Sequence, residues 1–334
     1  MFYDYILMPF IANLFDGNTN VTTDSGMTAE MKTYYSDYLI DLAEPKLVHA
    51  QFGQKAPIPK NGGKRIEFRK FNPLPKALTA LTEGVTPDGQ KMSVSTIEAA
   101  VQQYGGFVEL SDILLLTAID NNLVQATKAL AGQAGRTLDT IVREVLAGGT
   151  NVQYAEGQVE SRGELVGGQE SGNHYLTVDA VRQAVRTLKR MDAPTIDGSY
   201  VGIIHPDVAY DLMSDPKWVN VKSYSDPEGI YEGEIGKIEN VRFVETSEAK
   251  VFEGEGYDDR DVYATLILGD DAYGVSEIGG GGLQHIVKQL GSGGTGDPLN
   301  QRATAGWKAT SAAVRLVEAY MVRIETASTF TSAI

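Results

Sequence analysis

Two strand-forming segments lie on either side of a long stretch, residues 72–93, that holds too few apolar side chains to build a core. In the first segment, Ile66 and Phe68 share one face while charged residues occupy the other. The second segment runs from Val94 to Leu110 and alternates less regularly. Between them, Pro87-Asp88-Gly89 indicates a turn. A hairpin of this kind buries little surface on its own, so it predicts an arm that needs another surface to lie on.

The strongest helical pattern runs from about Leu123 to Ala147, and Gly148-Gly149 ends it. Such a helix is about 37 Å long. Ser111 and Asp112 are suited to cap a short helical segment before it. Apolar residues at three- and four-residue spacing predict its buried face, namely Leu130, Ala134, Leu138, Ile141 and Val145.

The rest of the chain alternates strands and helices. After a Gly- and Glu-rich segment, 150–175, which we expect to be an exposed loop, an amphipathic helix is predicted from Thr177 to Met191. Strands are predicted at SYVGIIH, VRFVET and VYATLIL, with a helix at PDVAYDLM. Residues 312–326 are expected to form one long final strand, with Arg315, Arg323 and Glu325 on the face opposite its apolar residues. These elements indicate an α+β fold.

The N-terminal region has a different character. Residues 1–15, MFYDYILMPFIANLF, are apolar but lack a basic leader and are shorter than the roughly 20 residues of a membrane helix. We expect an arm that docks on a neighbouring surface. A helix is predicted from about Thr28 to Leu42.

Charge and composition exclude several classes of function. The chain has 334 residues and a net charge of −15, so it is not suited to gripping nucleic acid over a broad surface or to binding an anionic membrane. Length suggests about two domains. The absence of cysteine excludes disulfides, thiolate zinc sites and cysteine nucleophiles.

No catalytic, cofactor-binding or metal site is predicted. The four histidines are scattered and form no metal-binding spacing. Residues 291–296 match G-x-G-x-x-G, but Asp297-Pro298 follows where a dinucleotide site needs a helix, which favours a flexible loop. The acidic clusters at 258–261 and 270–271 lack the spacing of a calcium loop.

One basic run stands out in this acidic chain. It favours a cationic arm that docks on an acidic neighbour; a solvated strand face and nucleic-acid binding are the alternatives. The candidate inter-subunit contact residues are Lys60, Lys64, Arg65, Arg69 and Lys70.

The order of these elements resembles the major capsid proteins of tailed bacteriophages, with the Hong Kong ninety-seven type fold, and most closely the phage N-four-like major capsid family. The resembling segments extend from about Met31 to Thr326, and they are MKTYYSDYLIDLAEPKLVHAQFGQKAPIP, GGKRIEFRKFNPLP, LTEGVTPDG, AGQAGRTLDTIVREVLAGGTNVQYA, GEIGKIENVRFVET and DPLNQRATAGWKA.

The resemblance implies an α+β capsid subunit with an N-terminal arm, an extended β-hairpin loop, a long spine helix, and peripheral and axial domains. The implied division is an arm at 1–55, an extended loop at 56–108, a peripheral domain at 109–176, an axial domain at 177–285 and a return to the peripheral domain at 286–334. Some members crosslink a loop lysine to an asparagine with help from a glutamate. Lys76, Lys91 and Asn300 match in part, but no glutamate lies close after Asn300.

The implied function is structural and needs no cofactor. Copies of the chain would assemble into hexamers and pentamers of an icosahedral head, enclosing double-stranded DNA without sequence-specific binding. A portal protein, and scaffolding or decoration proteins, are the further partners implied. The protein would assemble in the bacterial host cytoplasm and reside in the virion. An encapsulin-like compartment, a hydrolase of another fold and a minor phage structural protein are the alternatives.

Overall fold

The computed structural model describes residues 47–58, 64–71, 74–81, 83–84, 86, 88–117, 122–155, 159–167, 174–218, 234–277, 283–293 and 296–330. The apolar N-terminal segment and the helix expected from Thr28 to Leu42 lie outside these residues.

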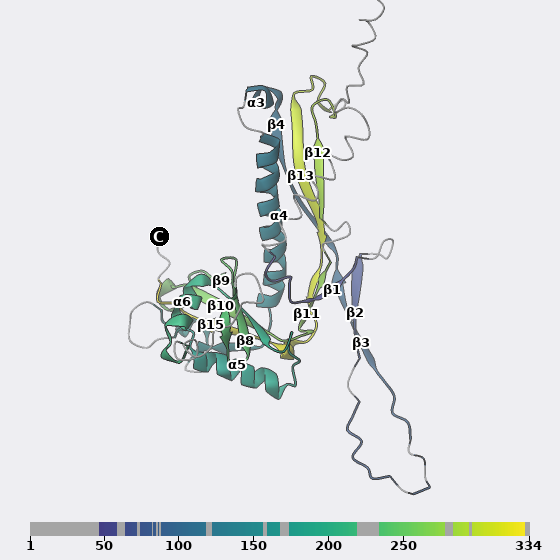
Figure 1. Ribbon diagram of the computed structural model, residues 1–334, viewed down its shortest axis with the longest axis vertical. Coiled ribbons are helices and arrows are strands. Elements are labelled where there is room, and N and C mark those ends of the chain that lie inside the picture. The colour runs from purple at the N-terminus through teal and green to yellow at the C-terminus, as the bar shows by residue number, and fades with distance from the viewer. Residues whose placement is uncertain are drawn as a thin grey trace, which may run out of the picture.

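One part of the molecule is elongated and has two layers. Helix α4 (Asn122–Ala147) lies along a three-stranded antiparallel sheet whose order is β12 (Leu283–Lys288), β13 (Arg302–Ser311), β4 (Gln102–Ser111). The short helix α3 (Asp112–Thr117) follows β4 at the far end of this part (Figure 1). The predicted short helix and the predicted long helix are both confirmed.

The buried face of α4 differs from the predicted one in its last two turns. Leu130, Ala134 and Leu138 are buried as expected, but the face continues through Val142 and Leu146. These positions follow Leu138 at four-residue spacing, and the C-terminal half of the helix packs there against a second sheet. Ile141 and Val145 are only half-buried.

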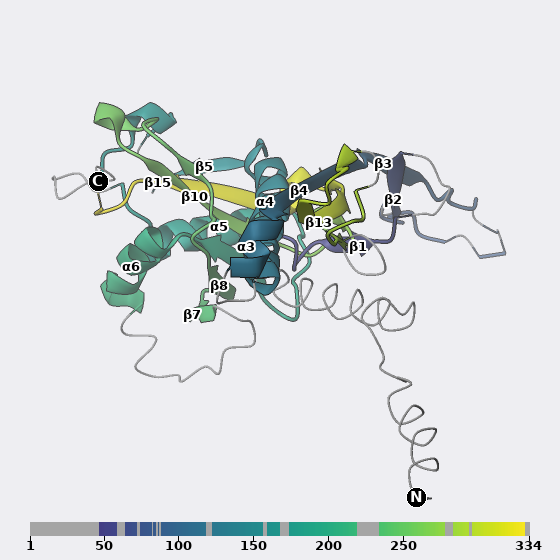
Figure 2. The same cartoon turned by 90° about the horizontal axis from the view of Figure 1, so that it is seen from above.

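The second part is a seven-stranded mixed sheet, described by the order β5–β15–β10–β6–β8–β7 with β9 paired to β10. Helix α5 (Val178–Arg190) and helix α6 (Pro206–Ser214) pack on one face of it, and α4 contacts the other (Figures 1 and 2). Its strands are β5 (Val152–Tyr154), β6 (Tyr200–Ile204), β7 (Glu234–Ile238), β8 (Val241–Glu245), β9 (Val251–Phe252), β10 (Val262–Leu268) and β15 (Met321–Thr326).

Helix α5 forms as its sequence predicts. Thr177 is the N-cap, and its hydroxyl accepts a hydrogen bond from the Ala180 amide at 3.3 Å. The apolar stripe of Val178, Val181 and Leu188 is fully buried against the sheet.

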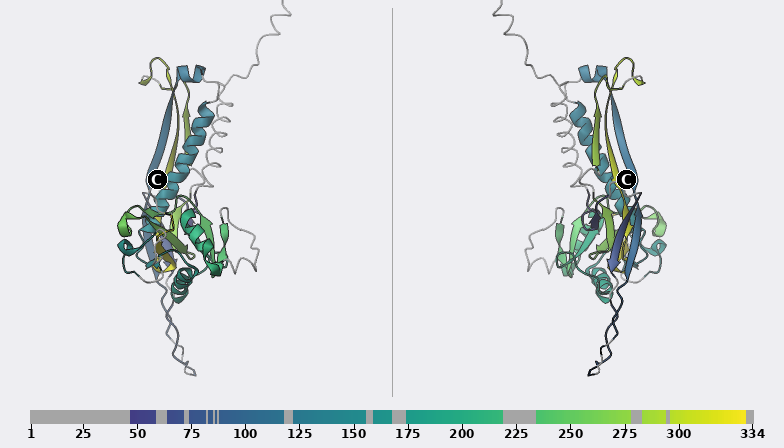
Figure 3. Two further views of the ribbon diagram at one scale, coloured as in Figure 1. Left: turned by 90° about the vertical axis from the view of Figure 1, so that its left-hand side faces the viewer. Right: turned by 90° about the vertical axis from the view of Figure 1, so that its right-hand side faces the viewer.

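The predicted hairpin is present as β2 (Arg65–Phe71) paired with β3 (Val94–Ala100). The described residues between these strands project away from the rest of the molecule (Figures 1 and 3). The segment expected as one strand from Val94 to Leu110 is two strands, β3 and β4. Up to Ala100 the chain pairs with β2, and after Val101 it pairs with β13. The Val101 amide there bonds to the Lys64 carbonyl.

The hairpin is seated on a small three-stranded sheet of β1 (Gln54–Ala56), β11 (Tyr273–Ser276) and β14 (Ala313–Arg315). Ile66 and Phe68 are buried there, as the alternation of β2 predicts. A Cβ on Gly274 of β11 would overlap the Phe68 ring, so a glycine is needed where the arm meets the body.

Two sequence expectations are wrong. Residues 312–326 do not form one strand: β14 ends at Arg315, a 3-10 turn at Glu318–Tyr320 (η6) follows, and β15 then enters a different sheet. Alternation cannot reveal this change of partner, because both strands keep a two-residue period. The expected exposed loop at 150–175 contains strand β5 and the fully buried Leu165.

Candidate functional site

The exposed face of the hairpin carries two of the predicted cationic residues. Arg65 and Arg69 point away from the buried Ile66 and Phe68, because alternate residues of a strand face opposite sides. Lys64 is also exposed and lies just before the strand begins. Lys60 lies outside the described residues.

Each arginine on this face has an acidic neighbour on the hairpin itself. Arg65 is paired with Glu98 on β3, and Arg69 lies 3.5 Å from Glu67. All four side chains are about half exposed or more, so the pairs are worth about 0–1 kcal/mol each. The cations therefore stay available to an acidic partner.

Lys70 differs from the others because it faces its own subunit. Its Nζ lies 4.9 Å from the centroid of the Tyr320 ring. Together they line a cavity of 290 Å³ between β2 and the body, which Asp271 also lines. Burial raises the pKa of Asp271, the neighbouring Asp270 raises it further, and Lys70 opposes them. Lys70 therefore helps to fix the base of the arm.

The described tip of the arm is apolar and uncovered. Leu78 is 86% exposed and Leu81 is 77% exposed, and Leu74 and Met92 are also largely open to solvent. Large apolar side chains gathered at one projecting tip indicate a contact with another surface.

A second open surface lies on the three-stranded sheet, on the face that α4 does not cover. A hollow of 680 Å³ is lined by residues of β4, β12 and β13 and by Ser292, Gly293, Gly296 and Asp297. Phe107 is 70% exposed there and Ile286 is 43% exposed. We call this hollow the trough.

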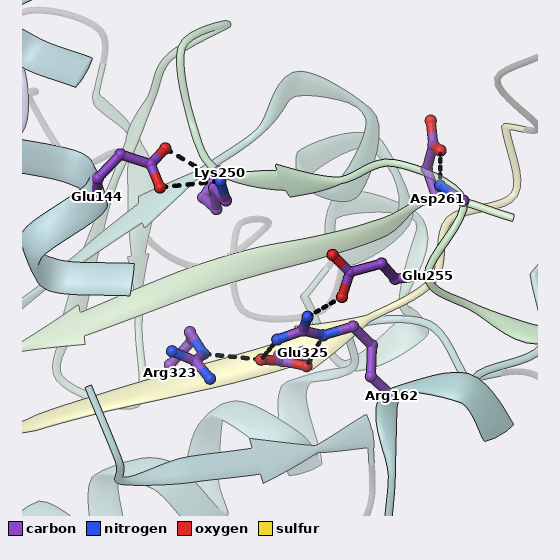
Figure 4. A network of polar contacts seen from close by, with 8 residues as sticks. Glu144, Arg162, Lys250, Glu255, Asp261, Arg323 and Glu325 are labelled. Carbon is purple, nitrogen blue, oxygen red and sulfur yellow. Dashed lines mark hydrogen bonds and ion pairs between the residues drawn. The ribbon is translucent and has the colours of Figure 1, made fainter. Parts of the chain in front are cut away.

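A polar network joins the elongated part to the seven-stranded sheet (Figure 4). At its centre, the fully buried carboxylate of Glu325 accepts two hydrogen bonds from Arg162, at 2.7 and 2.9 Å, and one from Arg323 at 2.8 Å. Arg162 is also paired with Glu255, and its guanidinium stacks 3.4 Å from the centroid of the Phe252 ring. Glu325, and then Glu255, hold the pKa of Arg162 above its ordinary value.

The same junction holds the C-terminal end of α4. Arg323 donates to the Gly149 carbonyl at 3.0 Å, and Arg315 donates to the Val145 carbonyl at 2.6 Å. Lys250 binds Glu144 of α4 at 2.9 Å. Cations at a helix C-terminus satisfy carbonyls that have no partner within the helix.

Sequence reasoning missed this network. Arg323 and Glu325 were expected on the face opposite the apolar residues of the final strand, and Arg162 was expected in an exposed loop. Their spacing held a partial signal, since opposite charges two residues apart in an apolar strand share one face. Arg162 comes from 163 residues away, so no local pattern identifies it.

Two of the histidines have clear structural contacts. His49 is fully buried, and its Nδ1 lies 2.7 Å from Asp139 of α4, which makes it part of a structural contact. His174 Nδ1 accepts a hydrogen bond from the Val166 amide. Across the described ranges, no group of histidine and carboxylate side chains is arranged to hold a metal ion. No helix in those ranges is long and apolar enough to cross a membrane.

The fold is that of a phage capsid subunit. The capsid of Ralstonia phage GP4 superimposes with a TM-score of 0.59 at 15% identity, covering 84% of this chain and 86% of that chain. The cyanophage Pam1 capsid gives 0.58 at 14% identity, covering 78% and 85%. The capsid of Helicobacter pylori bacteriophage KHP30 gives 0.60 at 8% identity, covering 84% and 90%. No curated protein matches.

A family model described as phage capsid protein matches residues 80–290. The chain therefore belongs to the phage capsid protein family. The prediction of a major capsid protein with the Hong Kong ninety-seven type α+β fold is confirmed. The encapsulin-like alternative is not favoured.

Proposed function

We propose that this chain is the repeating subunit of an icosahedral phage head, that it closes into hexamers and pentamers, and that it performs no catalytic step. The observation that carries the proposal is the projecting β2–β3 arm. Its tip exposes Leu78 and Leu81, and its base exposes Lys64, Arg65 and Arg69. Such a surface is covered only when another copy lies against it.

Each part of the subunit has its own role in this proposal. The β2–β3 arm, which covers the first part of the expected loop at 56–108, reaches a neighbouring copy, and the elongated part built on α4 and β4 forms the shell wall. The unit at 177–285 surrounds the symmetry axis of each hexamer or pentamer. The last segment, 286–334, contributes β12 and β13 to the elongated part and β15 to the seven-stranded sheet, so it ties the two parts together.

The remaining partners follow from the same role. Packaged double-stranded DNA is enclosed without base-specific contacts, since a chain of net charge −15 offers phosphate no broad basic surface. A portal protein occupies one vertex, and scaffolding or decoration proteins assist the shell. Assembly takes place in the bacterial cytoplasm, and no cofactor is required.

Negative-stain electron microscopy of the purified full-length chain, with light scattering, tests this role. We expect closed shells of uniform diameter. A protein that stays monomeric under all assembly conditions and turns over an ester or peptide substrate would contradict the proposal and favour a hydrolase.

A further inference from the structure

We propose that His205 is an acid-sensitive cap of helix α6, and that its protonation loosens the C-terminal segment that α6 holds in place. We call this segment, residues 327–330, the C-terminal strap. The device belongs to the folded subunit and goes beyond the proposed function, because it does not depend on how copies assemble. Helix α6 lies on the side of the second part that is remote from the β2–β3 arm (Figures 1 and 2).

His205 caps the N-terminus of α6 through its ring. Its backbone is extended, with φ −79° and ψ 147°, and its Nδ1 accepts a hydrogen bond from the Asp207 amide at 3.2 Å. Pro206, at the start of the helix, has no amide hydrogen to satisfy. Serine, threonine, aspartate and asparagine are the usual residues at a cap. Histidine differs from all of them because its charge ordinarily changes between about pH 5 and 8.

The cap exists only while Nδ1 carries no proton. An amide N–H can donate to a bare ring nitrogen, but a protonated Nδ1 is itself a donor. Protonation of His205 therefore leaves two donors facing each other, and the Asp207 amide loses its partner. Helix α6 has nine residues, so loss of its first turn leaves a helix too short to persist by itself.

The surroundings of His205 favour the neutral ring. Burial lowers the pKa of His205, and the negative charges of Asp207 and Glu245 oppose this without reversing it. The Asp207 carboxylate lies 3.4 Å from Nδ1, but it also accepts a hydrogen bond from the Tyr263 hydroxyl at 2.8 Å. The Tyr263 ring packs on His205, with the two centroids 4.9 Å apart.

This direction of the pKa determines how stability depends on pH. A histidine whose pKa is lowered on folding stabilises the folded state fully above its ordinary pKa of 6.5. The contribution is lost as the pH falls from there through the folded pKa, because the folded state then has to accept a proton that it disfavours. Acid should therefore weaken the start of α6.

The second half of α6 holds the C-terminal strap through Asp211. Its carboxylate, which is almost fully buried, accepts hydrogen bonds from the Ser328 hydroxyl at 2.8 Å, the Thr329 amide at 3.0 Å and the Thr329 hydroxyl at 2.5 Å. The Phe330 ring stands edge-on to Tyr210 of the same helix, with 5.3 Å between the centroids. Because these contacts are all made to α6, fraying of the helix should free the strap.

Hydrogen–deuterium exchange of the full-length, unassembled subunit tests the device at about pH 7.5 and pH 5. In the wild type, the protection of α6 and of the strap should fall about fivefold in acid, as expected for the loss of one cap. Helix α5 is the internal reference, because its cap, Thr177, does not titrate.

Two substitutions at the cap give the matched comparison. His205→Asn keeps a cap that carries no titratable group, so the protection of α6 should be the same at both pH values. His205→Ala has no cap, so the protection should be low at both. An acid response that is equal in the wild type, in His205→Asn and in the reference helix would overturn the proposal.

His174 is the competing histidine. Its Nδ1 accepts a hydrogen bond from the Val166 amide at 2.8 Å, and its carbonyl accepts one from the Ala327 amide at the start of the strap. We expect His174→Asn to leave the acid response intact. A strap that stays acid-sensitive in His205→Asn but not in His174→Asn would place the switch at His174, and the proposal fails.

Nitrogen NMR of histidine-labelled subunit examines the ring itself. At neutral pH, His205 should carry its proton on Nε2, and it should titrate below its ordinary pKa of 6.5. A midpoint above 6.5, together with an α6 that is better protected in acid, would show that the ion pair with Asp207 outweighs the lost cap. That result would overturn the proposal.

Discussion

Glu325 is the residue on which the junction between the two parts depends. Its carboxylate has no exposed surface and holds Arg162 and Arg323 together. We predict that Glu325→Ala lowers the free energy of unfolding by about 3 kcal/mol, because it leaves the buried Arg323 guanidinium without its carboxylate partner. Urea denaturation of the unassembled subunit, followed by circular dichroism, measures the change.

Glu255 supplies the matched control. It binds the same Arg162, but half of its side chain is exposed. Glu255→Ala should therefore cost less than about 1 kcal/mol. Equal losses for Glu325→Ala and Glu255→Ala would contradict the central role of the buried carboxylate.

Glu144 makes the same junction sensitive to acid. Burial alone would raise its pKa, but hydrogen bonds from Lys250 and Arg143 outweigh this and hold the pKa below the ordinary value of 4.5. A carboxylate whose pKa is lowered on folding stabilises the folded state above its unfolded pKa, and this contribution disappears as the pH falls through the folded pKa.

We predict that Glu144→Gln reduces the loss of stability between about pH 5 and pH 3. The effect should be small, since nearly half of the side chain is exposed. Denaturant midpoints measured across this pH range for both proteins test it. Parallel pH profiles would show that other carboxylates account for acid sensitivity.

At the scale of helices and strands, periodicity predicted the elements that bury one continuous face. Helices α4 and α5 and strand β10 were predicted within a residue or two of their bounds. The final strand could not be predicted, because β14 and β15 belong to different sheets. Alternation gives the face of a residue but not the strand that pairs with it.

The hairpin gives the clearest prediction at this scale. Replacing Lys64, Arg65 and Arg69 by Glu should leave the circular dichroism of the subunit nearly unchanged, since these side chains are exposed. Particle formation should be strongly impaired, because a weak contact is repeated around the whole shell. High salt should weaken wild-type assembly in the same direction. Electron microscopy and light scattering measure particle yield.

The control for this variant uses the acidic partners of the same arginines. Glu67→Lys with Glu98→Lys breaks the same pairs within the hairpin but leaves the arm more basic. It should assemble. Normal shells from the triple glutamate variant would mean that the face is merely solvated, and an unfolded subunit would mean that these residues belong to its own structure.

The packing of the hairpin on the body, through Phe68 against Gly274, can be tested separately. Gly274→Ala would drive a methyl group into the Phe68 ring, and overpacking of this kind costs about 1–3 kcal/mol. Gly89→Ala in the arm loop meets no atom within 4 Å and should be nearly neutral. Thermal denaturation compares the two. Equal melting temperatures would show that the arm can shift on the body without cost.

For the whole molecule, the basic run predicted the cationic face of β2, but no sequence pattern predicted the trough or the polar junction. Arg65 and Arg69 lie four residues apart on β2, so the face that they share follows from alternation alone. The trough joins residues near 107, 286 and 306, and the junction joins residues 162 and 325. Both arise only when distant strands pair, which no local pattern encodes.

The last prediction concerns how the assembled shell is held together. Crosslinking between subunits would need a glutamate near Asn300, and the next one along the chain is Glu318, which is engaged by Arg315 at the end of α4. We therefore expect Lys76 and Lys91 to stay unlinked. Boiling purified particles in detergent should release a single band at 36.1 kDa. A ladder of multimers that survives boiling and reductant, and that disappears in Asn300→Ala, would show that a covalent bond forms. Without such bonds, the strength of the shell is the sum of many contacts that are individually reversible, so particles should dissociate at high salt or denaturant and reassemble when it is removed.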